Sequence, residues 1–391
     1  MPLPLPLPSG DLRSMRRWLA ERQSRWCGAL EELVRCESPS GDREAIDNCA
    51  RLVERQFAAE VGPADIRRFE ADGVPSLLLR WGEAEDSAPL LLGHLDTVWE
   101  VGSFQPAYQA SAGRAQGPGV FDMKGGVVVA MAALAGLRQF SSAPGNLTLL
   151  LTGDEEVGSR GSRPLIEVES RRHGAVLVLE PPLGQAVKIA RKGIGGFRLT
   201  VRGRAAHAGL DPERGVNSLV AIAPLVASAA ALARPELGTT VSPTVLRAGS
   251  RTNVIPAEAW LEIDVRFASG AEADRVEAGL QELQLSVPGA VLEVAGGINR
   301  PPLEPVASHE LFQSAREIAM ELEWPDLEGA SVGGGSDGNF TAAQGVPTLD
   351  GLGIVGGNAH AEGEWADLDS IPDRAALLAG LVQKIWAGGS P

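Results

Sequence analysis

Leu90-Leu91-Leu92-Gly93-His94-Leu95-Asp96-Thr97-Val98-Trp99 is the segment around which the rest of the chain is organised. The apolar run between Pro89 and Gly93 predicts a buried strand of a parallel sheet. The strand would deliver His94 and Asp96 to its carboxyl end, where open α/β sheets hold their sites. Histidine is the commonest metal ligand among side chains, and a ligating histidine is usually supported by a carboxylate. An H-x-D pair alone is weak evidence for a metal site, so its meaning depends on what the neighbouring strand ends carry.

The composition is that of a large and acidic chain. With 391 residues it is too long for one ordinary core, so two domains are expected. Hydrophobic residues make up 44% and charged residues 22%, as in soluble globular proteins. The net charge of −15 argues against nucleic acid or an anionic membrane as a partner, because both require a basic face. It does not exclude an anionic substrate.

The cysteines and the N-terminus predict a cytoplasmic protein. Cys27, Cys36 and Cys49 are odd in number and lack C-x-x-C spacing, which favours ordinary thiols in a reducing compartment. Residues 1–8 alternate proline with leucine and lack the basic region and the long apolar run of a signal peptide. We expect no stretch to approach the apolar length of a membrane span.

Strand-like and helix-like segments alternate over much of the chain, which predicts an α/β fold with a mostly parallel sheet covered on both faces. The expected strands span residues 74–81, 90–93, 147–151, 175–179 and 347–352. An acidic turn is expected at residues 83–87. The expected helices span residues 11–34 (one or two helices), 42–57, 127–138, 308–320 and 371–386.

A different pattern interrupts this alternation after residue 190. Strands are expected at residues 197–201, 239–246, 257–267 and 290–294, with helices at 216–233 and 272–283. The order β-α-β-β-α-β is typical of a four-stranded antiparallel sheet with two helices, the ferredoxin-like α+β arrangement. We therefore predict a small domain over residues 191–300, inserted between the main-domain segments 1–190 and 301–391.

Residues of metal-ligand type collect at predicted strand ends and in one late loop. They are His94, Asp122, Glu155, Glu156, Glu180 and His360. Two histidines and three carboxylates suit a pair of zinc ions, with one carboxylate between the ions and one acid left free. Such a pair polarises a carbonyl and lowers the pKa of a shared water, whose proton the free acid would pass to a leaving nitrogen.

Four motifs, taken together and in order, resemble those of a known family. They are His94-Leu95-Asp96-Thr97-Val98, Asp122-Met123-Lys124-Gly125-Gly126, Asp154-Glu155-Glu156-Val157-Gly158-Ser159 and Ala359-His360. The chain resembles the two-zinc peptidases of the aminoacylase, acetylornithine deacetylase and glutamate carboxypeptidase family, and most of all the bacterial glutamate carboxypeptidases of the carboxypeptidase G type. The resemblance implies a zinc-exopeptidase-like catalytic domain over residues 1–190 and 301–391, and a lid or dimerisation domain over 191–300.

The resemblance also implies roles for the metal-ligand-type residues. His94 and Glu180 would hold one zinc, Glu156 and His360 the other, and Asp122 would lie between them. Cobalt or manganese would be accepted in vitro, since nitrogen and oxygen sites of this type discriminate weakly.

The same resemblance assigns the acid–base chemistry. Glu155 would be the general base, and Asp96 would support His94 from behind. The peptide bond between Asp122 and Met123 would be cis.

Residues of the inserted domain complete the implied site. His207 would stabilise the oxyanion, reaching the site of a neighbouring subunit in a homodimer formed through the lid. Asn253 and Arg266 would clamp the substrate, because a guanidinium grips a carboxylate with two hydrogen bonds. Gly334 and Gly335 would offer backbone close to the same carboxylate.

The expected activity is hydrolysis of the amide bond of an N-acyl amino acid or short peptide beside a free C-terminal carboxylate. Release of glutamate from folate-type conjugates is the specific expectation. An N-acyl-amino-acid deacylase of the acetylornithine deacetylase or aminoacylase type stays open, as does a non-catalytic member that binds a metal or ligand. The presence of Glu155 and of every ligand counts against the non-catalytic alternative, and the lack of a G-x-S-x-G motif counts against a serine hydrolase.

Overall fold

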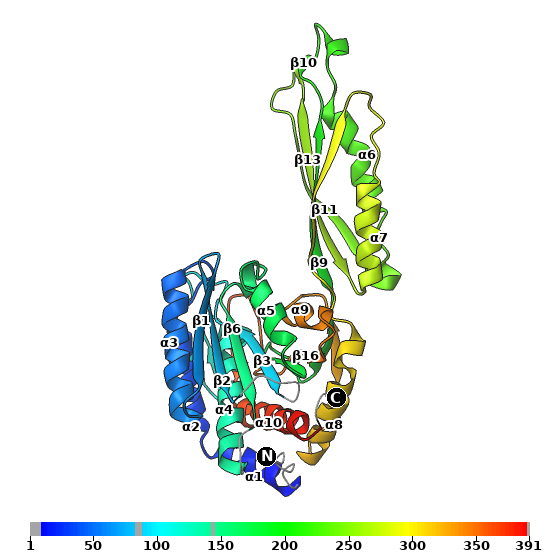
Figure 1. Cartoon of the computed structure of the whole chain (residues 1–391). Coiled ribbons are helices and arrows are strands. Elements are labelled where there is room, and N and C mark those ends of the chain that lie inside the picture. The colour runs from blue at the N-terminus through cyan, green and yellow to red at the C-terminus, as the bar shows by residue number, and fades with distance from the viewer. Residues whose placement is uncertain (1–8, 83–87, 142–144, 389–391) are drawn as a thin grey trace. The chain divides into compact units, whose positions relative to one another are not determined.

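A computed structural model describes residues 9–82, 88–141 and 145–388 of the chain (Figure 1). The proline- and leucine-rich segment 1–8 and the acidic turn expected at 83–87 lie outside the described residues. The chain divides into two compact units. The first unit comprises Met1–Ala190, Pro305–Ser331 and Ser336–Pro391, and the second comprises Arg191–Glu304 and Val332–Gly335.

The first unit is built on a six-stranded sheet of order β1-β2-β6-β3-β7-β16. Its strands are β1 (Asp65–Ala71), β2 (Val74–Trp81), β3 (Pro89–His94), β6 (Leu147–Thr152), β7 (Ala175–Val178) and β16 (Thr348–Leu349). β6, β3, β7 and β16 are parallel, whereas β2 runs antiparallel to both of its neighbours, β6 and the edge strand β1. The predicted mostly parallel sheet is confirmed. β1 was not predicted, because its largely exposed sequence Asp65-Ile66-Arg67-Arg68-Phe69-Glu70-Ala71 has no apolar alternation.

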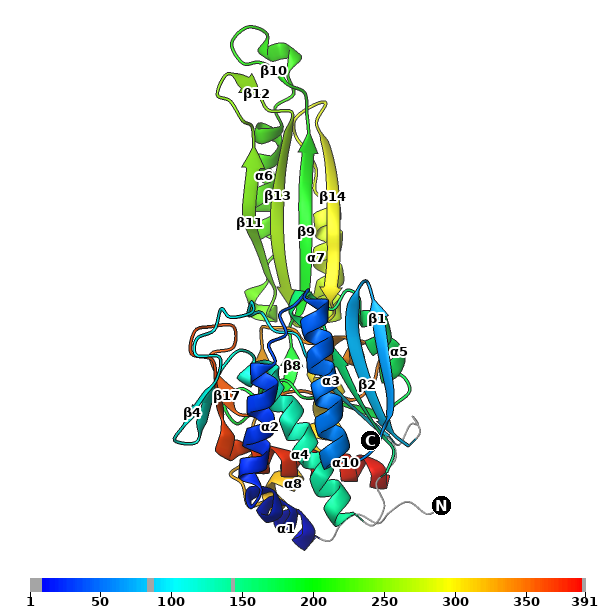
Figure 2. The same cartoon turned by 90° about the vertical axis from the view of Figure 1, so that its left-hand side faces the viewer.

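Helices cover both faces of this sheet (Figures 1 and 2). The larger core cluster holds apolar side chains of α1 (Ser9–Ala20), α2 (Gln23–Arg35), α3 (Arg43–Glu60), α4 (Gly125–Phe140), α8 (Pro305–Glu321) and α10 (Ile371–Gly388). The smaller cluster, formed by side chains of the opposite pleat, packs against α5 (Arg163–Ser170) and α9 (Gly338–Ala343). Every residue of β3 is buried, which explains why its sequence is a continuous apolar run rather than an alternation.

The helical stretch Val120–Phe140 is long and apolar enough to cross a membrane, so the expectation that no stretch approaches such a span was wrong. Its most apolar window is 94% buried inside the first unit. All residues of α4 from Gly125 to Leu137 are buried. A helix that is apolar on every side is the ordinary product of a fully buried position, and α4 occupies one.

Short elements in the loops were not predicted, because two to five residues carry no periodic signal. A four-stranded sheet of order β17-β18-β5-β4 joins β4 (Gln109–Ser111), β5 (Arg114–Gln116), β17 (Gly356–Gly357) and β18 (Trp365–Asp367). β8 (Val187–Arg191) and β15 (Gly329–Val332) form a two-stranded sheet. The short helices are η1 (Val120–Lys124), η2 (Glu155–Val157), η3 (Pro212–Arg214), η4 (Pro235–Leu237) and η5 (Leu368–Ser370).

The second unit has the expected order of elements, strand-helix-strand-strand-helix-strand. Its sheet has the order β11-β13-β9-β14 and is antiparallel throughout. The strands are β9 (Gly193–Arg202), β11 (Thr240–Ala248), β13 (Glu258–Phe267) and β14 (Val291–Arg300), and the helices are α6 (Ser218–Ala230) and α7 (Gly270–Gln281). Both helices pack on one face of the sheet, while β10 (Ala206–His207) pairs with β12 (Val254–Ile255) beyond it (Figure 2).

Candidate metal centre

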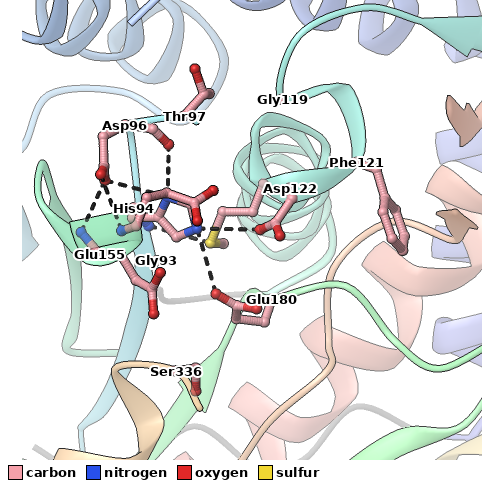
Figure 3. A network of polar contacts seen from close by, with 12 residues as sticks. Gly93, His94, Asp96, Thr97, Gly119, Phe121, Asp122, Glu155, Glu180 and Ser336 are labelled. Atoms are coloured by element: carbon pink, nitrogen blue, oxygen red, sulfur yellow. Dashed lines mark hydrogen bonds and ion pairs between the residues drawn. The ribbon is translucent and has the colours of Figure 1, made fainter. Parts of the chain in front are cut away.

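His94 is the last residue of β3 and is 1% exposed. Its Nδ1 lies 2.9 Å from the carbonyl oxygen of Asp96, a contact in which the ring N–H donates. Nε2 lies on the opposite side of the ring, 3.3 Å from Asp122 Oδ1 and 3.5 Å from Glu180 Oε1 (Figure 3). The expected support by Asp96 is therefore given first by its backbone, with the carboxylate Oδ1 at 3.5 Å.

Asp122 lies between the two histidines. Its Oδ1 faces His94 Nε2 at 3.3 Å, and its Oδ2 faces His360 Nε2 at 3.3 Å. The peptide bond from Asp122 to Met123 is cis, as the resemblance implied. The turn that leads into it contains Gly119 at a φ of 69°, a left-handed conformation that glycine adopts without steric cost.

His360 and Glu156 meet on the other side of Asp122. His360 Nε2 lies 3.0 Å from Glu156 Oε2 and 3.1 Å from Oε1. His360 itself has a φ of 60°, a left-handed conformation that histidine adopts more readily than most side chains. Glu155 and Glu180 have ligand atoms that lie within 4.8 Å of each other and of a His94 ring nitrogen, so geometry alone does not separate a base from a ligand here.

The carboxylate of Asp96 also binds the backbone of the segment that carries Glu155 and Glu156, which the sequence did not predict. It accepts the backbone N–H of Glu155 at 3.1 Å and that of Glu156 at 3.2 Å, one on each oxygen. Ser40 Oγ donates to the same carboxylate at 2.7 Å. Asp96 thus joins β3 to the short helix η2, which carries both glutamates.

The electrostatics of the cluster favour cations. Among the described residues, only the two imidazoles pair with Asp122 and Glu156. Asp122 and Glu156 raise the pKa of His360 to about 10. Burial lowers the pKa of His94, but its bonds to Asp122, Asp96 and Glu180 outweigh burial and raise that pKa well above the ordinary value.

The same contacts change the pKa values of Asp122 and Glu156. Burial raises the pKa of Asp122, yet the hydrogen bonds from His360 and His94 outweigh it and hold that pKa far below its usual range. Burial raises the pKa of Glu156 more than His360 lowers it. In the metal-free chain the two protonated imidazoles therefore supply the positive charge that balances Asp122 and Glu156. The neighbouring Lys124 points elsewhere: its Nζ donates to the Cys36 carbonyl at 2.8 Å.

The separations between the ligand atoms fit the coordination of divalent cations. In a tetrahedral site with bonds of about 2.0–2.1 Å, two ligand atoms lie roughly 3.3–3.4 Å apart. The observed separations of 3.3 and 3.5 Å around His94, and of 3.0 and 3.3 Å around His360, are close to that value. The group around His94 contains Asp122 Oδ1 and Glu180, and the group around His360 contains Asp122 Oδ2 and Glu156.

His207 and Asn253 lie next to each other in the second unit. His207 pairs with Val254 across β10 and β12, and the Asn253 carbonyl accepts the N–H of Ala208 at 2.9 Å. His207 Nδ1 accepts two backbone N–H groups, from Gly209 at 3.2 Å and Leu210 at 3.1 Å. In the neutral form of the ring the proton therefore lies on Nε2.

Arg266, Gly334 and Gly335 also belong to the second unit. Arg266 lies on β13 and forms an ion pair with Asp264, with Nη2 3.0 Å from Oδ2. The carbonyl oxygens of Gly334 and Gly335 each accept a bond of 3.2 Å from Arg191 Nη1. A Cβ at Gly334 would meet nothing within 4 Å, so the backbone there is open to a ligand.

Two buried acids of the first unit were missed. Asp337 accepts Thr152 Oγ1 at 2.9 Å and also Ser159 Oγ, which fixes both flanks of the segment that carries Glu155. Glu364 accepts backbone N–H groups from the segment before Asp122. Asp337 and Glu364 lie in glycine-rich loops, and nothing in the sequence of those loops indicates burial. The one usable signal is that Glu364 lies four residues after the predicted ligand His360.

Comparison with known proteins shows the family to which the chain belongs. Residues 90–384 match the model of peptidase family M20/M25/M40. Carboxypeptidase G2 of Pseudomonas sp. (strain RS-16) is 30% identical over 382 residues, which cover 92% of this chain and 89% of that protein. Succinyl-diaminopimelate desuccinylase of Thioalkalivibrio sulfidiphilus is 27% identical over 377 residues, covering 91% and 97%.

Solved structures share the fold. A dinuclear metal-binding peptidase of the M20 family from Bacillus subtilis superposes with a TM-score of 0.64 at 15% identity, covering 94% of this chain and 99% of that one.

Proposed function

Because this chain belongs to peptidase family M20/M25/M40 and is a hydrolase of the metallopeptidase type, we propose that it cleaves the amide bond of an N-acyl amino acid or short peptide beside a free carboxylate, with glutamate as the leaving group. The observation that carries the proposal is the placement of Asp122, whose two oxygens each face a different histidine. The likeness to carboxypeptidase G2 supports a carboxypeptidase reaction and makes glutamate conjugates the first substrates to test.

Two zinc ions are the proposed cofactors. His94 and Glu180 would hold one, Glu156 and His360 the other, and Asp122 would contact both. When bound, the ions polarise the scissile carbonyl and lower the pKa of a water. Around His94 and Glu180 the chain supplies buried ligand atoms, whereas His360 reaches the centre from an exposed loop.

Glu155 is the proposed general base. Its backbone is fixed by Asp96, so its carboxylate is held within 4.8 Å of ligand atoms of His94 and Glu180. A carboxylate oxygen of Glu155 would take a proton from the attacking water and return it to the leaving nitrogen.

Residues of the second unit would bind the substrate. His207 presents Nε2–H, which would donate to the oxyanion of the tetrahedral intermediate. Arg266 and Asn253 would hold the carboxylate, together with backbone at Gly334 and Gly335. Arg266 must then exchange or share its Asp264 partner, so we expect it to bind the substrate more weakly than an unpaired arginine.

A homodimer through the second unit is proposed from its surface. Helix α6 has exposed apolar side chains at Leu219 (42%) and Val220 (57%), and Leu246 on β11 is 38% exposed. Within the described residues β11 pairs on one side only, with β13. A second copy would cover both features and bring His207 to the partner's site. We also propose a cytoplasmic location, which suits the free thiols of Cys27, Cys36 and Cys49.

One alternative function has a specific observation behind it. The match to succinyl-diaminopimelate desuccinylase favours an N-acyl-amino-acid deacylase, of which the acetylornithine deacetylase and aminoacylase types are further examples. A substrate panel distinguishes the two: N-acyl-glutamates including a folate analogue, against N-succinyl and N-acetyl derivatives of other amino acids. Chelator-sensitive release of glutamate as the fastest reaction supports the proposal, whereas faster cleavage of a succinyl or acetyl derivative replaces it with the alternative.

A further inference from the structure

Glu364 is a buried acid in the same loop as His360, directly before strand β18. It is 1% exposed. It has no place among the ligands or the base of the proposed function. A buried carboxylate is costly unless its lone pairs are satisfied, so its partners indicate what it is for.

Four N–H groups satisfy the Glu364 carboxylate. Oε1 accepts from the backbone of Phe121 at 2.9 Å and of Asp122 at 3.0 Å. Oε2 accepts from the backbone of Gly119 at 3.1 Å and from Trp99 Nε1 at 2.7 Å. All four donors are neutral, and in the described part of the chain no lysine or arginine pairs with Glu364.

These bonds connect the loops of two proposed metal ligands. Three of the donors belong to the segment Gly119–Asp122, and one is the N–H of Asp122 itself. The acceptor follows His360 in its own loop. The 3.3 Å separation between Asp122 Oδ2 and His360 Nε2 therefore depends on an anchor that joins the two backbones directly.

We propose that Glu364 is a positioning residue that fixes Asp122 relative to His360 and thereby sets the metal affinity of the site they share. The inference rests on the proposed function, because it takes Asp122 and His360 as ligands. An outer partner that orients ligands in this way typically changes metal affinity about 10- to 100-fold when it is removed.

Glutamine at this position is the informative change. An amide has one oxygen, so one pair of N–H groups would face an NH2 group and lose its acceptor. We expect Glu364→Gln to bind cobalt at the site shared by Asp122 and His360 about 10- to 100-fold less tightly than wild type. The measurement is a cobalt titration of the chelator-treated protein, followed by the visible absorption of Co²⁺, whose bands report coordination directly.

Glu169→Gln is the matched control. Glu169 is also buried, at 4% exposed, and belongs to the first unit, where it pairs with Arg80 at 2.8 Å. It makes no contact with the candidate metal centre among the residues described. We expect this variant to lose thermal stability while keeping the wild-type cobalt affinity and spectrum.

Each outcome decides the inference. Weaker cobalt binding with a changed spectrum in Glu364→Gln, but not in Glu169→Gln, supports it. Wild-type affinity and spectrum in a folded Glu364→Gln protein overturn it, as does an equal loss of affinity in the control. If Glu364→Gln does not fold, the variant Trp99→Phe tests the inference, because it deletes only one of the four donors to Glu364. Cobalt binding that is weaker by about threefold or more supports the inference, and unchanged cobalt binding overturns it. A wild-type protein that binds no metal would refute the proposed function itself.

Discussion

Replacing Asp96 with asparagine tests whether the active-site turn depends on one buried carboxylate. The side chain is 0% exposed, so water cannot replace a lost acceptor. Its two oxygens are used differently: Oδ1 accepts Glu155 N–H at 3.1 Å, and Oδ2 accepts Glu156 N–H at 3.2 Å and Ser40 Oγ at 2.7 Å. In the amide, one of the two backbone N–H groups must face an NH2 group.

The expected loss of activity in Asp96→Asn follows from the loss of one hydrogen bond. A hydrogen bond to a charged group contributes about 1.5–3 kcal/mol, and the loss here falls on the turn that carries both proposed base and ligand. If the whole loss appears in the transition state, kcat/KM falls about 10- to 150-fold. We expect this fall for Asp96→Asn, together with a lower free energy of unfolding measured by urea denaturation.

Asp154→Asn is the control in the same turn. Asp154 is 3% exposed and accepts Gly161 N–H at 2.8 Å and Ser162 N–H at 3.3 Å, both at Oδ2. Among the described residues its Oδ1 has no hydrogen-bond partner, so an amide can keep both bonds. We expect kcat/KM of Asp154→Asn to stay within about threefold of wild type. Equal losses in the two variants, or full activity in Asp96→Asn, would refute the reasoning.

Three further predictions follow from the same geometry. Glu155→Gln should lose about 10²- to 10⁴-fold in kcat while keeping its bound metal, measured by turnover and metal analysis; near-wild-type turnover would remove Glu155 as the base. Mixing inactive Glu155→Gln and His207→Ala subunits should restore activity if His207 acts in the partner's site, because one of the two mixed sites is then complete; no restoration would place His207 in its own subunit's site or outside the mechanism. The pKa of His360 is raised to about 10 by Asp122 and Glu156, so at pH 7 the metal-free ring holds a proton that metal must displace. Metal affinity should therefore rise with pH up to about 10, with proton release seen by calorimetry in two buffers; affinity independent of pH would contradict this.

The fold was predictable where burial is complete. The run Leu90-Leu91-Leu92 became the central strand β3, because a strand buried on both faces has to be apolar throughout. Strand β1 was not predictable, since it is an exposed edge strand held by its register with β2 rather than by an apolar face. The helix α4 was predicted, but its apolar length was underestimated, because the kinked segment before Gly125 extends it.

The residues around the candidate metal centre were predictable for a topological reason. The carboxyl ends of parallel strands lie at one edge of the sheet, so His94, the last residue of β3, and Glu180, which follows β7, come together without any knowledge of loop conformation. Asp337 and Glu364 were not predictable in this way, because they reach the site along loops whose paths no pattern encodes. Glu362 and Glu364 look alike in the sequence, yet only Glu364 is buried.

Stepwise metal reconstitution of the chelator-treated protein tests the central claim most directly. Zinc would be added in known equivalents, and bound zinc and glutamate release from an N-acyl-glutamate would be measured on the same samples. We predict that the metal-free protein is inactive and that activity rises to its maximum as the second zinc per chain binds. Full activity without metal, or a maximum at one zinc per chain with no second ion bound, would contradict a two-metal site built on Asp122.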